Sequence, residues 1–232
     1  MGGMSGASGR ILFVTGTDTG VGKTLLTGLL LYHLRRRGCH ALAMKPFASG
    51  SRADARFLRG LMEDELPLDE INPYYFTAPL APLAAARKRQ ESPVLGEVVR
   101  KILRTARHCE CLLVEGIGGL MVPVGRGNTV LDLIVKLGCE VVVVGRNKLG
   151  TINHTVLTAE ALQHAGVNRL TTVLMGVRER DLSARTNVLV LREMLSPRRV
   201  YELPFLGRRP EVLGAVKEAE KKFKKTLALI SK

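Results

Sequence analysis

The sequence predicts a single α/β domain with a mostly parallel sheet and helices on both faces of that sheet. Short, continuous apolar runs alternate with segments of helical periodicity along the 232 residues. Such runs are typical of strands buried on both sides, and strands that alternate with helices favour parallel pairing. A composition of 46% hydrophobic and 24% charged residues is that of a globular domain, which excludes disorder as the main state.

The elements can be assigned in chain order from these patterns. We expect a flexible Gly- and Ser-rich tail over 1–10 and one domain over 11–232. The apolar runs predict strands at 11–15, 41–45, 111–115, 141–144, 170–175 and 199–203. Helical patterns cover 24–37, 93–107, 156–165 and 182–195, and a last helix is expected to bury Val212, Val216, Phe223, Leu227 and Ile230. The proline-rich segment 63–90 is expected to be loop and short helix, an insertion that faces a substrate.

Composition and charge exclude several classes of partner. The formal net charge of +14 is spread along the chain without a recognition-helix, RNA-binding or zinc-finger pattern, so we expect no nucleic-acid partner. No apolar run approaches the roughly 18 residues of a membrane span, and the first residues lack a signal-peptide core, so we expect no membrane partner. The four cysteines lie in or beside apolar runs and are expected to be buried free thiols of a cytoplasmic protein.

The strongest local signal is a glycine-rich segment between the first strand and the first helix, GTDTGVGKT at 16–24. Glycines let backbone N–H groups approach a polyphosphate closely, and the following helix directs its positive end at the same anion. Lys23 supplies a point charge for the β- and γ-phosphates, and the Thr24 hydroxyl is a ligand for Mg²⁺. The strict pattern places its first glycine at position 17, where this sequence has Thr17 and carries the glycine one residue earlier. The segment predicts a P-loop NTPase fold.

Charged residues at or near two other strand ends point to the same edge of the sheet. Glu115 ends one apolar strand, Lys45 ends another, and Asp54 follows Lys45 by nine residues. Because ligands of open α/β sheets bind at the carboxyl ends of strands, Glu115 is a candidate to hold a metal or orient water. Lys45 is a candidate second cation for the phosphates or for an anionic substrate. Asp54 alone is equally typical of an ordinary helix N-terminus.

Several blocks of sequence together resemble the dethiobiotin synthetase family of biotin synthesis. Besides GTDTGVGKT, the blocks are KPFASGS at 45–51, DA at 54–55, NPYYFTAPLAP at 72–82, VEGIGG at 114–119 and KLGTINHTVLTAEALQHAG at 148–166. They keep the family's order and spacing over roughly residues 11 to 211. The last block is long and little shared with other P-loop proteins, so the resemblance is specific and implies a single P-loop synthetase domain.

The resemblance implies a role for each matching residue. Lys45 matches the family's catalytic lysine, Lys23 would act on the γ-phosphate, and the Mg²⁺ ligands would be Thr24, Asp54 and Glu115. The residues expected to bind nucleotide are Thr19, Gly20, Val21, Gly22, Lys23, Thr24, Leu25, Asp54, Glu115, Gly116, Ile117, Gly118, Met175, Gly176, Pro204, Phe205, Leu206 and Glu211. Those expected to bind the substrate are Ser49 and, reaching over from a partner subunit, Leu149, Gly150 and Asn153.

The implied reaction joins 7,8-diaminononanoate and CO₂, with ATP as co-substrate and Mg²⁺ as cofactor, in a homodimer with two sites across its interface. One amine would form a carbamate with CO₂, and the carbamate oxygen would attack the γ-phosphate to give a carbamic–phosphoric anhydride. The second amine would then close the ureido ring and expel phosphate. Such a reaction asks the protein mainly for positioning and charge neutralisation.

Two positions depart from the family pattern. Met175-Gly176 stands where the family commonly has Asn-Asp, whose asparagine recognises adenine. Side-chain hydrogen bonding to the base is therefore lost, and we expect weak discrimination among ATP, CTP and GTP. Backbone groups there, or the region of 203–206 and Glu211, are then the candidates to hold a base. Ile117 stands where the family often has alanine, and its bulk is expected to narrow the diamine site.

Two other functions share the glycine-rich motif. A partitioning ATPase of the ParA or MinD type carries an additional lysine early in its loop, and the aligned position here is Asp18. The basic, amphipathic C-terminus resembles a membrane-targeting helix in composition, although a helix that covers the core with a solvated basic face is favoured. A nucleotide-binding paralogue without synthetase activity is the other alternative, and Ile117 and Met175 are the residues that support it.

Overall fold

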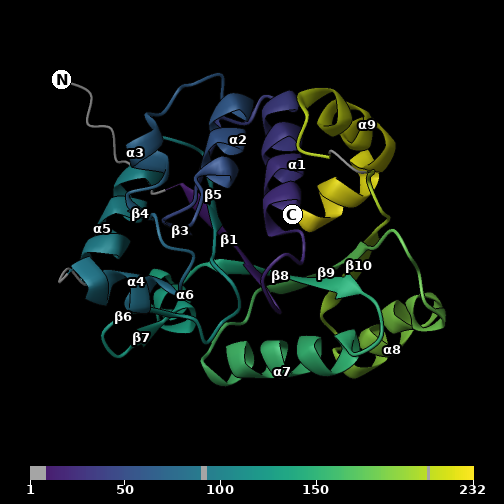
Figure 1. Ribbon diagram of the computed structural model, residues 1–232. Coiled ribbons are helices and arrows are strands. Elements are labelled where there is room, and N and C mark those ends of the chain that lie inside the picture. The colour runs from purple at the N-terminus through teal and green to yellow at the C-terminus, as the bar shows by residue number, and fades with distance from the viewer. Residues whose placement is uncertain (1–8, 90–92, 208–209) are drawn as a thin grey trace.

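The computed structural model describes residues 9–89, 93–207 and 210–232. Its central sheet consists of β1 (Arg10–Gly16), β2 (Ala41–Met44), β5 (Cys111–Glu115), β8 (Glu140–Asn147), β9 (Leu170–Gly176) and β10 (Arg199–Leu203). Their order across the sheet is β10-β9-β8-β1-β5-β2, and every neighbouring pair is parallel (Figure 1). The predicted α/β class with a mostly parallel sheet is confirmed, and all six predicted strands are present within a few residues.

Helices cover both faces of the sheet. On one face lie α1 (Lys23–Arg36), α2 (Ala53–Leu61) and α9 (Leu213–Ile230), and on the other lie α7 (Thr151–His164) and α8 (Asn187–Met194) (Figure 1). Two further helices, α5 (Leu95–Ala106) and α6 (Val130–Leu137), pack on each other, and α5 also packs on β5. This cover explains why the strands read as continuous apolar runs rather than alternating ones, since residues on both sides of each strand are buried.

The remaining elements form small additions at the edge of this core. They are β3 (Phe47–Ser49), α3 (Leu68–Ile71), β4 (Tyr74–Phe76), α4 (Pro82–Arg89), β6 (Pro123–Gly125), β7 (Asn128–Thr129) and the 3₁₀-helix η1 (Leu182–Arg185). The segment 63–90 holds the short helices that were expected there, together with β4, which pairs in parallel with β3 and was not predicted. None of the described helices is long and apolar enough to cross a membrane.

Several boundaries differ from the prediction for identifiable reasons. Helix α7 begins at Thr151 rather than at 156, because its first turns bury Thr151 and Thr155, which carry no apolar signal. The predicted helix 182–195 is two elements, with η1 capped by the Asp181 carboxylate and α8 beginning at Asn187. Val212 precedes α9 and is 55% exposed, so it does not belong to the buried face, whereas Val216, Leu227 and Ile230 do and Phe223 is partly buried against the core.

The N-terminal boundary and the cysteines complete the comparison. Residue 10 belongs to β1 rather than to a tail, because the Arg10 guanidinium pairs with the Glu140 carboxylate at 2.6 Å; residues 1–8 lie outside the described residues. The four cysteines are free, with Cys109 and Cys111 buried and the other two partly buried. Burial raises the pKa of Cys111 to about 12, so this thiol remains protonated and unreactive near neutral pH.

Candidate active site at the carboxyl edge of the sheet

The carboxyl ends of the six strands surround a cleft of about 1140 Å³. Strand β1 lies at its centre, because β5 and β2 extend the sheet on one side of β1 while β8, β9 and β10 extend it on the other. Open α/β sheets bind ligands at such a reversal of strand order. Of the predicted site residues, the cleft is lined by Thr19, Gly20, Val21, Gly22, Lys23, Thr24, Leu25, Lys45, Ser49, Asp54, Ile117, Gly118, Met175, Gly176, Pro204, Phe205, Leu206 and Glu211.

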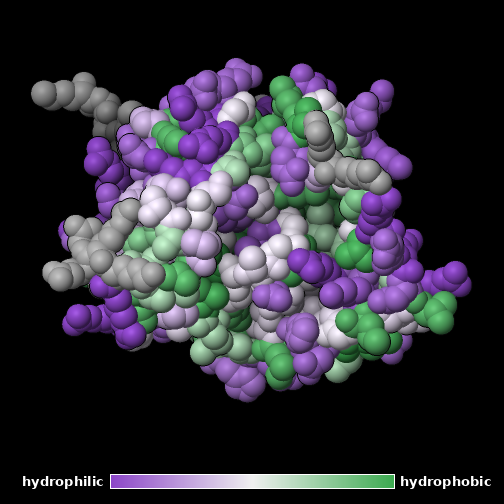
Figure 2. All heavy atoms as spheres, viewed as in Figure 1, coloured by the Kyte–Doolittle hydropathy of each residue, from purple (hydrophilic) through white to green (hydrophobic). Residues whose placement is uncertain are grey.

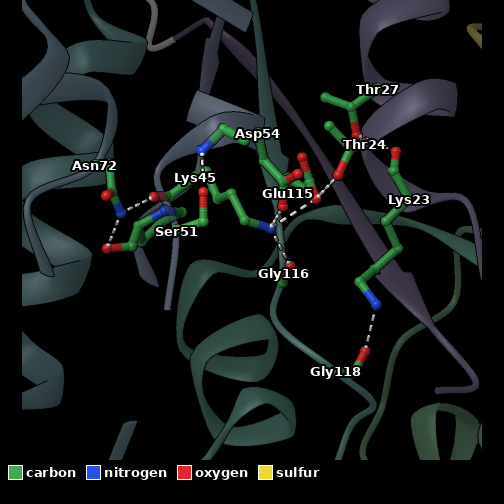
Figure 3. A network of polar contacts seen from close by, with 12 residues as sticks. Lys23, Thr24, Thr27, Lys45, Ser51, Asp54, Asn72, Glu115, Gly116 and Gly118 are labelled. Atoms are coloured by element: carbon green, nitrogen blue, oxygen red, sulfur yellow. Dashed lines mark hydrogen bonds and ion pairs between the residues drawn. The ribbon is translucent and has the colours of Figure 1, made fainter. Parts of the chain in front are cut away.

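The glycine-rich segment forms a tight turn between β1 and α1. Gly20 and Gly22 have φ values of +68° and +104°, a region that residues with a Cβ rarely adopt, so glycine is required at both positions. Lys23 opens α1, and its ammonium donates to the Asp18 carbonyl at 2.8 Å. It also donates to the Gly118 carbonyl at 2.8 Å (Figure 3). Burial, followed by the nearby charge of Lys45, lowers the pKa of Lys23 to about 8. Lys23 lines the cleft, and because the residue is buried its ammonium is only weakly solvated.

Strand register brings Lys45 and Glu115 together. Met44 of β2 is in register with Val114 of β5, so the next residue of each strand lies at the same height of the sheet edge. The Lys45 ammonium is 2.7 Å from Oε1 of Glu115 and 3.1 Å from Oδ2 of Asp54, which comes from α2 (Figure 3). The Thr24 hydroxyl donates to the same Glu115 oxygen at 2.7 Å. The four residues predicted from separate segments thus form one polar cluster beside the glycine-rich segment 16–24, which is called the phosphate loop below.

The cluster is deeply buried at its centre. Glu115 and Lys45 are 1% and 5% exposed. Burial alone would lower the pKa of Lys45, but the carboxylates of Glu115 and Asp54 outweigh it and raise this pKa above its usual value, so the residue is a cation. A buried cation held by two carboxylates is suited to meet an anion that enters the cleft.

The same oxygens fit a magnesium ion. Oε2 of Glu115 is buried and has no hydrogen-bond partner among the residues that the structure describes, and the Asp54 carboxylate and Thr24 hydroxyl lie in the same cluster. Carboxylate and hydroxyl oxygens are ligands that Mg²⁺ takes together with phosphate oxygens of a bound nucleotide. Within the described residues no group of three or more His, Cys, Asp or Glu side chains could hold a metal alone. A magnesium ion here would therefore depend on oxygens brought by the substrate.

A buried asparagine fixes the backbone that carries Lys45. Asn72 is 1% exposed, and its amide donates to the Lys45 carbonyl at 2.8 Å. Arg52 in turn donates to the Asn72 side-chain oxygen at 3.1 Å and to its carbonyl at 3.0 Å. Asn72 belongs to the conspicuous block at 72–82, but the sequence did not indicate this supporting role. The cleft-facing part of the insertion is formed by Pro79, Leu80, Ala81 and Pro82.

The far end of the cleft offers an apolar surface. The Met175 side chain packs on the phosphate loop, since a Cβ added at Gly22 would lie 3.0 Å from Cγ of Met175. Gly176 is close to the segment after β10, because a Cβ there would lie 2.5 Å from the Phe205 nitrogen. Phe205 itself is 43% exposed, and Leu206 and Glu211 line the same region. A planar base can pack against these groups, while the Met175 side chain presents no hydrogen-bonding group to its edge.

Some predicted residues do not line this cleft. Glu115 and Gly116 lie behind its surface, where the Gly116 carbonyl accepts from Lys45 at 3.4 Å. Leu149, Gly150 and Asn153 are exposed at the start of α7, outside the cleft. Leu149 instead lines a neighbouring depression with Arg180, Asp181, Leu182, Ser183 and Arg185. These three predicted substrate residues therefore do not reach the phosphate loop of their own chain.

The structure adds residues that the sequence patterns did not reveal. Arg146, at the end of β8, lines the cleft and contacts the phosphate loop. Asn147 and Asn187 are buried and joined by a 2.9 Å hydrogen bond, and Asn147 also donates to Glu202. The Asp181 carboxylate accepts from the Leu149 N–H at 2.8 Å, which fixes the loop before α7. The position of Arg146 two residues after a run of four valines was the available signal.

Comparison with known proteins gives a family for this arrangement. A family model described as an AAA domain matches residues 10–219. A protein of Anaeromyxobacter dehalogenans named ATP-dependent dethiobiotin synthetase is 41% identical over 222 residues, which cover 92% of this chain and 100% of that protein. Proteins of the same name from Bacillus velezensis and Bacillus subtilis are each 35% identical; the matches cover 88% and 90% of this chain and 87% and 90% of theirs.

Solved structures show the same fold at low identity. The MinC:MinD cell division protein complex of Aquifex aeolicus contains a chain that matches with a TM-score of 0.59 at 13% identity, over 96% of this chain and 93% of that one. A plasmid partition protein of Borrelia burgdorferi bound to AMPPNP matches with a TM-score of 0.63 at 9% identity, over 96% and 99%. At such identities the likeness establishes the P-loop NTPase fold alone. It does not support the alternative of a partitioning ATPase over the function named in the sequence relatives.

Proposed function

The chain belongs to the family of ATP-dependent dethiobiotin synthetases, ligases that form carbon–nitrogen bonds, and from this premise we propose how its own residues carry out the reaction. The observation that supports the assignment of roles is the cluster in which the Lys45 ammonium lies between Glu115 and Asp54 beside the phosphate loop. The substrates are 7,8-diaminononanoate, CO₂ and ATP. The products are dethiobiotin, ADP and phosphate.

The phosphates of ATP lie on the N-terminal turn of α1. Residues 19–25 line the cleft there, and the helix directs its positive end toward the anion. The Lys23 ammonium leaves the carbonyls of Asp18 and Gly118 and binds the γ-phosphate, which is possible because Lys23 lines the cleft. Its lowered pKa does not prevent this, because a bound phosphate favours the charged form.

Magnesium would be held by Thr24, Asp54 and Glu115 together with oxygens of the nucleotide. When bound, the ion supplies neutralisation of negative charge on the transferring phosphoryl group. The orphaned Oε2 of Glu115 supports this assignment, since a buried carboxylate oxygen without a partner is costly unless a ligand completes it.

Lys45 stabilises the anionic groups of the reacting substrate. One amine of the diamine adds to CO₂ and loses a proton, giving a carbamate. A carbamate oxygen forms a bond to the γ-phosphorus while the bond from phosphorus to the ADP oxygen breaks, giving the carbamic–phosphoric anhydride. The second amine then attacks the carbonyl carbon, loses its proton, and phosphate leaves as the ureido ring closes. The buried Lys45 ammonium offsets charge on the carbamate and phosphoryl oxygens, and Ser49 on β3 binds the substrate beside it.

We further propose a homodimer in which Leu149, Gly150 and Asn153 of one subunit reach the diamine bound at the other. Leu149 and Leu182 are 78% and 81% exposed. Three further exposed apolar side chains lie on α7 and α8, namely Leu157, Leu189 and Met194. In Figure 2 separate apolar patches alternate with polar ones along the lower edge of the molecule, over these helices. Leu149, Gly150 and Asn153 are exposed and lie outside the cleft of their own chain, so they are available to a second copy.

One assay tests the proposal as a whole. Purified protein is incubated with diaminononanoate, bicarbonate, Mg²⁺ and ATP, and the products are analysed by mass spectrometry and by phosphate release. We expect a cyclic urea with the mass of dethiobiotin, and phosphate release that requires both the diamine and bicarbonate. ATP hydrolysis that proceeds without the diamine and yields no cyclic urea would contradict the proposal and favour a nucleotide-binding paralogue.

A further inference from the structure

Arg146 lies against the phosphate loop because of where it falls on β8. Successive side chains of a strand point to opposite faces of the sheet. A Cβ at Gly145 would meet Thr151 and Thr155 of α7, so Gly145 faces that helix and Arg146 faces the side of α1 and the loop. Arg146 is in register with Met175 of β9, which lies on the same face. Two neighbouring strands therefore place their last inward-facing side chains side by side under the glycine-rich turn.

The guanidinium of Arg146 contacts two carbonyls of that turn. Nε donates to the Gly20 carbonyl at 3.0 Å, and Nη2 donates to the Thr19 carbonyl at 3.4 Å. A Cβ added at Gly20 would lie 2.6 Å from Nη2 of Arg146, so the guanidinium occupies the space that glycine leaves open. Met175 meets Gly22 in the same way. Gly20 and Gly22, both with positive φ, are thus each in contact with a side chain from the end of a sheet strand.

These contacts act on the peptide groups that bind phosphate. The Thr19 carbonyl shares a rigid peptide plane with the Gly20 N–H, and the Gly20 carbonyl shares one with the Val21 N–H. Holding the two carbonyls fixes the direction of both N–H groups, which donate to no other group in the described part of the chain. Without such a restraint, the free rotation of glycine allows the peptides to turn their carbonyls toward the anion.

We propose that Arg146 is a positioning residue of the phosphate loop, whose guanidinium orients the Gly20 and Val21 N–H groups toward the β-phosphate of a bound nucleotide. The planar fork of arginine suits this role, since one side chain reaches adjacent carbonyls in a single plane. The inference rests on the proposed function only in taking this loop as the nucleotide site. It predicts that Arg146 contributes equally to the binding of ATP and of ADP, because both carry a β-phosphate.

The test measures the dissociation constants of ATP and ADP, without diamine, for Arg146→Gln, Arg146→Lys and the control Arg126→Gln. Arg126 is exposed on the β6–β7 turn, so its replacement removes the same charge away from the cleft. We expect Arg146→Gln to weaken ATP and ADP by a similar factor of about 10, or about 1.4 kcal/mol. Arg146→Lys is expected to restore part of that affinity, and Arg126→Gln is expected to change it less than twofold. Thermal unfolding of each variant confirms that it is folded before binding is measured.

Each other outcome overturns the inference in a distinguishable way. A loss confined to ATP would mean that Arg146 contacts the γ-phosphate directly, and an unchanged affinity for both nucleotides would mean that the loop does not need it. If Arg126→Gln weakened binding by the same factor, the loss of affinity would be due to the lower net charge of the protein, and the positioning role would be refuted. Because binding is measured without diamine, failure of the protein to make dethiobiotin would leave this test intact. Production of dethiobiotin with unchanged nucleotide affinity in Arg146→Gln would refute the positioning role alone.

Discussion

Replacement of Lys45 by methionine tests the central cluster most directly. The side chain keeps a similar length but loses its charge, which leaves the carboxylate of Glu115, 1% exposed, with the Thr24 hydroxyl as its remaining partner in the described chain. Removing one member of a buried ion pair costs about 3–5 kcal/mol. For a domain of this size each kcal/mol shifts Tm by about 2–4 °C, so without Mg²⁺ we expect Tm to fall by about 6–20 °C.

The same variant separates binding from turnover. Within the described residues the polar partners of the Lys45 ammonium are Glu115, Gly116 and Asp54, and none belongs to the glycine-rich turn. ATP affinity is therefore expected to stay within a few-fold of the parent, whereas product formation is expected to fall to background. Thermal unfolding followed by circular dichroism measures the fall in Tm, and mass analysis of the cyclic urea measures product formation. The control is Lys45→Met combined with Glu115→Gln, which removes both charges and is expected to regain most of the lost Tm. A double variant less stable than Lys45→Met, or normal dethiobiotin formation by Lys45→Met, would refute the reasoning.

Four further predictions concern other parts of the molecule. Because the Met175 side chain cannot read a base edge, dissociation constants for ATP, CTP and GTP should lie within about 100-fold, or roughly 2.7 kcal/mol, and a wider spread in competition binding would reveal a base contact elsewhere. Thr129→Ala should lower the free energy of unfolding by about 1 kcal/mol in urea titrations, while Thr129→Ser should not. Hydrogen bonds from Thr129 lower the pKa of Asp132, so the stabilisation from this carboxylate is present above about pH 4 and should be lost as pH falls through the lowered pKa. Leu182→Asp should convert the proposed dimer to monomers in light scattering and reduce turnover, and an unchanged mass would contradict the proposed interface.

The fold could be predicted to the extent that burial leaves a local trace in the sequence. Strands such as β5 and β8 are apolar on both faces, and that pattern needs no knowledge of their neighbours. Helix α6 was missed although Thr129 and Asp132 form a capping box, because its eight residues read as a short apolar run that equally suits a strand. The first turn of α7 was missed because Thr151 and Thr155 are buried through polar contacts rather than apolar ones.

The candidate site was predicted where the chemistry is carried by a motif or by a strand end. Lys23 and Thr24 follow from the glycine-rich segment itself, and Lys45 and Glu115 follow from the rule that parallel strands present their carboxyl ends at one edge. What the sequence could not provide was strand order. The Lys45 ammonium lies 2.7 Å from the Glu115 carboxylate only because β2 and β5 are neighbours in the sheet. Neither sequence segment indicates that it pairs with the other.

Arg146 shows the same limit more sharply, because its role depends on face as well as on order. The valine run of β8 indicates a buried strand, but a side chain shifted by one residue would point at α7 instead of at the loop. The contact of this guanidinium with the loop depends on three conditions. Strand β8 lies next to β1, and the side chain of residue 146 points to the face of the sheet on which the loop lies. The residue that follows Thr19 is a glycine, which has no Cβ to occupy the space of the guanidinium. Each condition is set by a different segment of the chain. A residue whose role depends on three separate segments is not marked by a local sequence motif. The glycine-rich loop can therefore be recognised in the sequence, whereas the side chain that orients its peptide groups is recognised only in the folded structure.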